Sequence, residues 1–140
     1  MTEHPVINRE TLDALRVELG VHFPRILGYF AEDGMKSLEA VEDAVRNRDA
    51  VALVLPAHTL KGESLQFGAE RLGFAAEYIE EAARDGVEMR GFPLEIVEYG
   101  ARLRSLFEEA LTALQAEAAF VEAAPAPIRR PAAGFGRKIG

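Results

Sequence analysis

His58, Lys61 and Gly62 are the residues of this chain whose types and spacing best suit a chemical role. An imidazole near neutral pH is a nucleophile as well as a base. If it attacks a phosphoryl group, a fixed cation must balance the charge of that group, and Lys61 lies one helical turn away. A glycine in the middle of a helix costs about 1 kcal/mol relative to alanine. That cost is reasonable if the backbone or a loop of a partner must come close at Gly62.

The segment around His58 has the periodicity of a helix with one buried face. At roughly 100° per residue, the residues that share the core face are Leu53, Ala57, Leu60, Ser64 and Phe67. The neighbours of His58 on the outer flank are Val54, Leu55, Lys61, Gly62 and Leu65. Several of them are more apolar than a solvated face requires, and an exposed apolar patch around a titratable group is typical of a docking site. The alternative is that His58 is only a solvated surface side chain.

The other candidates for chemistry are weaker. We expect His22 to lie in the turn between the first two helices and His4 to be disordered. Ser64 lies on the core face, where its hydroxyl is expected to bond a backbone carbonyl rather than act as a nucleophile. The chain has no cysteine, and its paired acids lack histidine partners in sequence, so no metal site is predicted. Without a Walker-type glycine loop, the sequence gives no support for nucleotide binding or kinase activity.

The first 120 residues divide into segments with helical periodicity, and strand signals are nearly absent. A short first helix is capped by Asn8 and stopped by Gly20. The four longer segments run from Pro24 to about Arg46, from Asp49 to about Phe67, from Glu70 to about Arg84 before Asp85-Gly86, and from Pro93 onwards. Short loops between long amphipathic helices predict an all-α fold, an antiparallel four-helix bundle with the short helix covering one end.

The charge is distributed unevenly along the chain. Residues 1–120 carry a net charge of −10 and residues 121–140 a net charge of +3. The acidic body argues against nucleic-acid binding, which depends on dense Lys and Arg contacts to phosphates. Residues 121–140 are rich in Pro, Ala and Gly, and we interpret them as a flexible basic tail behind a 1–120 domain. With no membrane-spanning run and no secretory signal, we expect a monomeric cytoplasmic protein.

The motif His-x-x-Lys-Gly resembles the core pattern of the histidine-containing phosphotransfer (HPt) domain family of phosphorelays. The residues that carry the resemblance are His58, Lys61, Gly62, Ser64 and Gly68, with Ala57 before them and Leu72 after them. The likeness covers about residues 8–119. It implies that His58 is phosphorylated at Nε2 and that the bundle docks a receiver domain bearing a phosphoaspartate. It also implies that any Mg²⁺ belongs to the receiver and that the chain has no cofactor of its own.

Several HPt domains hold the histidine with a Glu or Gln on the next helix, and the matching position here is Glu80. A carboxylate that accepts a hydrogen bond from Nδ1–H fixes the tautomer and leaves Nε2 free; the alternative is a solvated helix charge. Two positions depart from the pattern. Glu63 replaces a small residue but points away from His58, whereas Pro56 lies inside the third helix and predicts a kink.

The sequence therefore predicts a phosphorelay intermediate, not an enzyme with kinase activity, that shuttles a phosphoryl group through His58 between receiver aspartates. Its partners are expected to be response-regulator receivers and a hybrid or sensor histidine kinase. Val54, Leu55, Gly62 and Leu65, with Ile26 and Tyr29 of the second helix, are the expected docking residues. Two alternatives remain: a helical adaptor or anti-activator without phosphoryl chemistry, and the detached phospho-accepting domain of a chemotaxis-type kinase.

Overall fold

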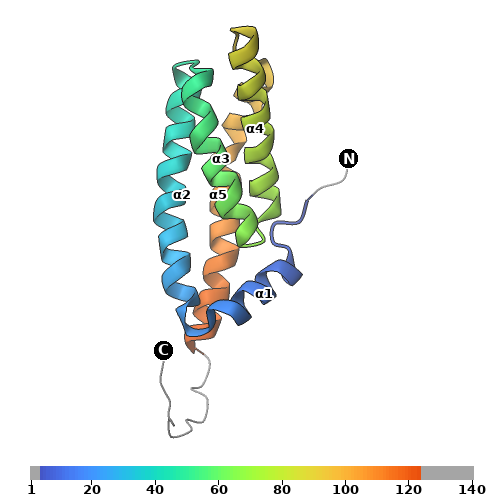
Figure 1. Ribbon diagram of the computed structural model, residues 1–140. Coiled ribbons are helices and arrows are strands. Elements are labelled where there is room, and N and C mark those ends of the chain that lie inside the picture. The colour runs from blue at the N-terminus through green and yellow to red at the C-terminus, as the bar shows by residue number, and fades with distance from the viewer. Residues whose placement is uncertain (1–3, 124–140) are drawn as a thin grey trace, which may run out of the picture.

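The chain folds as a bundle of helices in the computed structural model, which describes residues 4–123. The elements are α1 (Arg9–Leu19), the short 3₁₀ helix η1 (Gly20–His22), α2 (Phe23–Arg46), α3 (Ala50–Gln66), α4 (Glu70–Met89) and α5 (Leu94–Ala123). Helices α2 to α5 lie side by side, and α1 crosses the lower end of the bundle (Figure 1). The all-α class and the four-helix bundle predicted from the sequence are confirmed.

The core lies between the four long helices and is built from the apolar stripe of each. Aromatic rings link three of them: Phe30 of α2 lies 5.0 Å from Phe67, just after α3, and 5.9 Å from Phe107 of α5, measured between ring centroids. Gly34 of α2 is buried at the same contact, where an added Cβ would lie 2.7 Å from Cε1 of Phe107. The glycine therefore lets α2 and α5 approach closely.

Helix α1 is fastened to the loop between α3 and α4. The side chain of Asn8 caps α1 by accepting a hydrogen bond from the Thr11 amide. The Asn8 amide donates to the carbonyl of Gly68 at 2.7 Å. Gly68 has a φ of +79°, and a Cβ there would lie 2.8 Å from the Asn8 carbonyl oxygen. This turn thus combines a left-handed backbone with a close chain crossing, and both conditions favour glycine.

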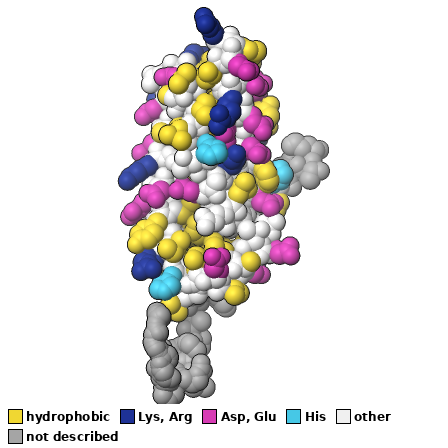
Figure 2. All heavy atoms as spheres, viewed as in Figure 1, with side chains coloured by type: hydrophobic (Ala, Val, Ile, Leu, Met, Phe, Trp, Pro, Cys, Tyr) yellow, Lys and Arg dark blue, Asp and Glu magenta, His cyan; other side chains and the backbone are white. Residues whose placement is uncertain are grey.

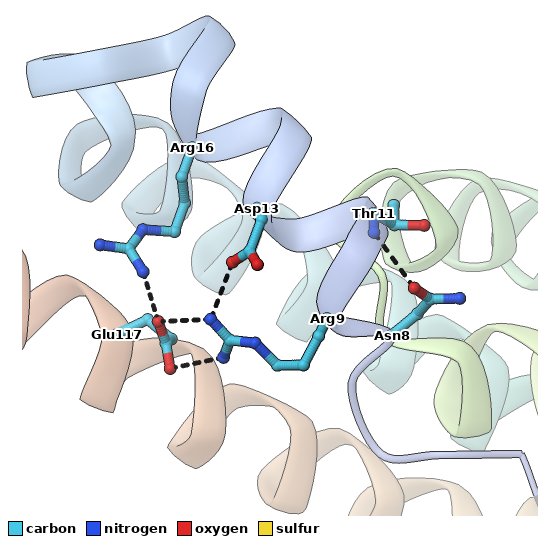
Figure 3. Close-up of polar contacts among 6 residues, drawn as sticks. All are labelled: Asn8, Arg9, Thr11, Asp13, Arg16 and Glu117. Atoms are coloured by element: carbon cyan, nitrogen blue, oxygen red, sulfur yellow. Dashed lines mark hydrogen bonds and ion pairs between the residues drawn. The ribbon is translucent and has the colours of Figure 1, made fainter.

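A second set of contacts ties α1 to the far end of α5 (Figure 3). Glu117 accepts hydrogen bonds from Arg16 at 2.6 Å and from Arg9 at 2.8 Å, and Arg9 also contacts Asp13 at 2.8 Å. The Arg9 hydrogen bond and nearby positive charges lower the pKa of Glu117 despite its partial burial. Two cations from the first helix therefore share one carboxylate of the last.

We expect Glu117→Gln to lower the free energy of unfolding by about 1 kcal/mol, because both arginines then lose a charged acceptor in a partly shielded position. Hydrogen exchange of the α1 amides should accelerate in the same variant. The control is Glu108→Gln, an exposed position on α5, which should change neither quantity. Equal α1 exchange in wild type and Glu117→Gln would show that the cluster does not hold the helix.

Two expectations about local structure are wrong. Helix α4 does not end at Asp85-Gly86 but continues to Met89. Gly86 is buried within the helix, and an added Cβ would lie 2.8 Å from the Gly91 carbonyl oxygen, so the glycine serves close packing rather than termination of the helix. His4 is ordered: its ring stacks on Phe74 at 4.2 Å between centroids, and its carbonyl accepts a hydrogen bond from Arg71. His22 does lie in the turn before α2, as predicted.

Helix α5 extends to Ala123, three residues beyond the expected limit of the bundle. The rest of the predicted tail, residues 124–140, lies outside the described residues. Within residues 4–123, none of the helices combines the length and the apolar character that crossing a membrane would require.

Candidate functional site

Helix α3 carries His58 on its outer side. The helix begins after Asp49, whose side chain caps it by accepting a hydrogen bond from the Ala52 amide at 3.0 Å. It then continues without interruption through Pro56 to Gln66. All five residues expected on its core face are buried, whereas the His58 side chain is 54% exposed. The face of the bundle drawn in Figure 2 shows a histidine near its middle, with Lys or Arg side chains beside it.

The residues expected to receive a partner differ in how far they reach into solvent. Leu55 is 69% exposed and Tyr29 is 53% exposed. Gly62 is exposed, and a Cβ added to it would meet nothing within 4 Å, so the backbone there can be approached freely. The partly buried members of the set are Val54, Leu65 and Ile26. Leu65 also packs against Gly73 of α4, which gives this side chain a role inside the bundle.

The next helix, α4, places the Glu80 carboxylate beside the His58 ring. Glu80 is only 5% exposed, so the alternative of a solvated helix charge is wrong. Its Oε2 lies 3.0 Å from Nδ1 of His58. Because an ionised carboxylate is only an acceptor, this contact assigns the proton to Nδ1 and leaves the lone pair of a neutral ring on Nε2.

Two cations hold the same carboxylate. Lys61 of α3 is 22% exposed, and its Nζ lies 3.0 Å from Oε1 of Glu80. Arg84 donates to Oε2 from Nε at 3.1 Å and from Nη2 at 2.8 Å. Burial alone would raise the pKa of Glu80, but the hydrogen bonds from Arg84, Lys61 and His58 outweigh it and lower that pKa to about 2. The carboxylate is thus fully ionised at neutral pH.

Arg84 is the one member of this cluster that the sequence reasoning missed. It follows Glu80 by four residues on α4, a spacing that places opposite charges on neighbouring turns. That spacing is a usable signal, but it becomes informative only once Glu80 is known to face His58. In the sequence the same pair is indistinguishable from the ordinary charge pairs of a solvated helix face.

The remaining positions of interest lie away from His58. Ser64 is fully buried, and its hydroxyl has no hydrogen-bond partner among the described residues, so the expected bond to a backbone carbonyl is wrong. Glu63 lies on the side of α3 that approaches Asp33 of α2, and burial together with the charge of Asp33 raises the pKa of Glu63. Within residues 4–123, no three His, Asp or Glu side chains are grouped as a metal site would require.

The known proteins that this chain resembles indicate its family. The chain matches the family model described as the Hpt domain over residues 25–117. No curated protein matches it. Among solved structures, the crystal structure of histidine-containing phosphotransfer protein B (HptB) from Pseudomonas aeruginosa PAO1 is similar, with a TM-score of 0.73 and 24% identity. That match covers 82% of this chain and 96% of the other, and it shows a shared fold.

The matched span contains the two helices that bring His58, Lys61 and Glu80 together, and it makes up about two-thirds of the chain. The chain therefore belongs to the Hpt domain family, the histidine phosphotransfer proteins of phosphorelays.

Proposed function

We propose that His58 accepts a phosphoryl group at Nε2 from the aspartyl phosphate of one receiver domain and passes it to an aspartate of another. The observation that carries this proposal is an exposed imidazole whose Nδ1 lies 3.0 Å from a buried carboxylate. The carboxylate restrains the ring from inside the bundle, and the opposite nitrogen is left for an incoming partner.

The transfer step follows from this arrangement. The Nε2 lone pair of the neutral ring attacks phosphorus, the N–P bond forms, and the bond from phosphorus to the aspartyl oxygen breaks. The electron pair of that bond leaves with the aspartate, which becomes a free carboxylate on the receiver. The Nδ1 proton stays in its hydrogen bond to Glu80 and stabilises the positive charge that develops on the ring. The reverse sequence delivers the group to the next aspartate.

Lys61 has the role of balancing phosphoryl charge next to His58. We expect Lys61→Ala to slow transfer by about tenfold without abolishing it, because the lysine stabilises charge but forms no bond. Single-turnover transfer from a phosphorylated receiver domain measures this rate. Lys36→Ala is the control, since Lys36 is an exposed lysine of α2. Identical rates for wild type and Lys61→Ala would contradict the electrostatic role.

Docking is assigned to the apolar surface around His58, with Leu55 and Tyr29 as its exposed anchors and Gly62 as the point of close approach. Val54, Leu65 and Ile26 complete this surface. The partners are response-regulator receivers and a hybrid or sensor histidine kinase. The protein acts as a cytoplasmic monomer without a cofactor of its own, and the Mg²⁺ needed for transfer is supplied by the receiver.

The deciding experiment incubates the purified protein with a panel of receiver domains that carry labelled phosphate. Label should appear on the protein and should be labile in acid and stable in alkali, as a phosphoramidate is. Transfer onward to a second, unlabelled receiver should then deplete it. A protein that binds receivers but never acquires label from any of them would instead be an adaptor, the alternative that the family membership does not favour.

A further inference from the structure

We propose that Glu63 selects among receiver domains by binding a lysine or arginine side chain on the docking face of the partner. The inference deepens the proposed function and rests on it, since it names a chemical property of the receivers that this protein accepts. It starts from a carboxylate at the edge of the docking surface, one oxygen of which is buried without a hydrogen-bond partner among the described residues. Glu63 also replaces the small residue of the family pattern, so this selectivity is a property of the present chain.

Glu63 lies next to the surface assigned to docking. It follows Gly62, the exposed point of close approach on α3, and it lies on the side of α3 that approaches Asp33 of α2. Asp33 is exposed and lies one helical turn beyond Tyr29, so these two side chains share a face of α2. Figure 2 shows acidic side chains next to apolar ones on the face that carries the central histidine. A partner that contacts Tyr29 and Gly62 therefore reaches both carboxylates.

The carboxylate of Glu63 lacks a counter-charge. The residue is half-buried, and its Oε1 is shielded from solvent without a hydrogen-bond partner in the part of the chain that the structure describes. Burial together with the negative charge of Asp33 raises the pKa of Glu63. None of the ion pairs within residues 4–123 includes either carboxylate. A buried acceptor without a donor is costly, so a cationic donor supplied by a partner is favoured at Glu63.

Neighbouring cations of the chain itself have other partners. Lys61 precedes Glu63 by two residues on α3, but its Nζ lies 3.0 Å from Oε1 of Glu80. Arg25 of α2 contacts the ring of His22. Over residues 4–123, no group of three His, Asp or Glu side chains could hold a metal ion, so the structure favours a cationic side chain of the partner. A guanidinium has enough donors to bind two carboxylates at once.

The same carboxylate discriminates against other receivers. A receiver with Asp or Glu at the facing position would bring a third negative charge beside Glu63 and Asp33, which costs affinity. A receiver with an apolar residue there would leave Oε1 of Glu63 buried and without a donor. Both kinds of receiver therefore bind less tightly than one with a basic residue, and this difference in affinity is the selectivity that we propose.

The test measures the Kd of unphosphorylated receiver domains for the full chain, and the probe is the receiver of the panel that binds wild type most tightly. Glu63→Gln keeps the size of the side chain and removes its charge, and it should weaken binding by about tenfold. Asp33→Asn should weaken binding by about threefold, since Asp33 is exposed. Glu88→Gln is the matched control, because it removes the same charge from an exposed position on α4. Its Kd should remain within about twofold of wild type.

A double-mutant cycle identifies the basic residue of the partner. Each exposed Lys and Arg of that receiver is changed in turn to Gln, and each variant is measured against wild type and against Glu63→Gln. We expect one receiver variant to bind wild type about tenfold more weakly and to bind Glu63→Gln with no further loss. Unchanged binding of Glu63→Gln, or additive losses with every Lys and Arg of the receiver, would overturn the proposal.

The free protein provides a second measurement, which separates selectivity from a structural role. Because burial and Asp33 oppose the ionisation of Glu63, Glu63→Gln should unfold at a urea concentration no lower than wild type. Weaker binding accompanied by a lower urea midpoint would overturn the proposal, since Glu63 would then support the fold. Label transfer is measured separately: a receiver that binds through Glu63 but never labels His58 would overturn the proposed function alone. If no receiver binds the protein, both are overturned.

Discussion

His58→Gln is expected to reduce phosphorylation by receiver domains to background, a loss of more than about a hundredfold. The lone pair of a glutamine amide nitrogen is delocalised into the carbonyl, so it cannot attack phosphorus as Nε2 of imidazole does. The fold should survive, because more than half of the His58 side chain is exposed and such a substitution changes the free energy of unfolding by about 1 kcal/mol or less. Label transfer and urea denaturation measure the two effects.

The control for this variant is His22→Gln. His22 is an exposed histidine in the turn before α2, where its ring contacts Arg25. It should acquire label at the wild-type rate. Label that persists on His58→Gln would place the acceptor elsewhere and would reject the proposed function. Loss of label accompanied by unfolding would instead contradict the surface position that the structure gives to His58.

Acid should destabilise the protein through Glu80, by an amount of up to about 3 kcal/mol. Its folded pKa of about 2 lies below the ordinary value of 4.5, so protons bind the unfolded chain more readily than the folded one. The stabilisation is therefore fully present above about pH 5 and is lost as the pH falls toward 2. Glu80→Gln removes this dependence, so the variant should be less stable at pH 7 and should approach wild type near pH 2.

Denaturant unfolding of both proteins at a series of pH values isolates this effect. Other carboxylates with lowered pKa values, such as Glu42 and Glu117, cancel in the difference between the two curves. Glu81→Gln, at the next position and exposed, should remain within about 0.5 kcal/mol of wild type throughout. A difference between wild type and Glu80→Gln that stays constant from pH 7 to pH 2 would show that its ion pairs do not stabilise the fold.

Helical periodicity was sufficient to predict the fold and the side of α3 on which His58 lies. The core positions of α3 recur every three or four residues, and apolar residues at that spacing can be buried only if the intervening positions face outward. Asn8 and Asp49 were recognisable as caps because their short polar side chains satisfy free amides at a helix start. These signals are local, so they can be recognised in one sequence.

The features that escaped prediction depend on contacts that a helix makes with other parts of the chain. The end of α4 was misplaced because Gly86 has the usual appearance of a helix terminator, whereas its role is to admit the loop that returns at Gly91. His4 gained order from Phe74, seventy residues away in sequence. The spacing of Arg84 and Glu80 suits an ion pair on one helix. It does not reveal that this pair lies beside His58, because that depends on which face of α4 packs against α3.

The contacts of α1 with the rest of the bundle determine how far the N-terminus can be truncated. The part shared with the family begins at residue 25, yet Leu12 and Leu15 of α1 are buried against the remainder. A protein that begins at residue 25 would expose that apolar surface to solvent. It would also lack Arg9 and Arg16, the two arginines that bind Glu117. We therefore expect the smallest unit that unfolds cooperatively to be larger than the part that matches the family, and truncations should retain the chain from Asn8 onward.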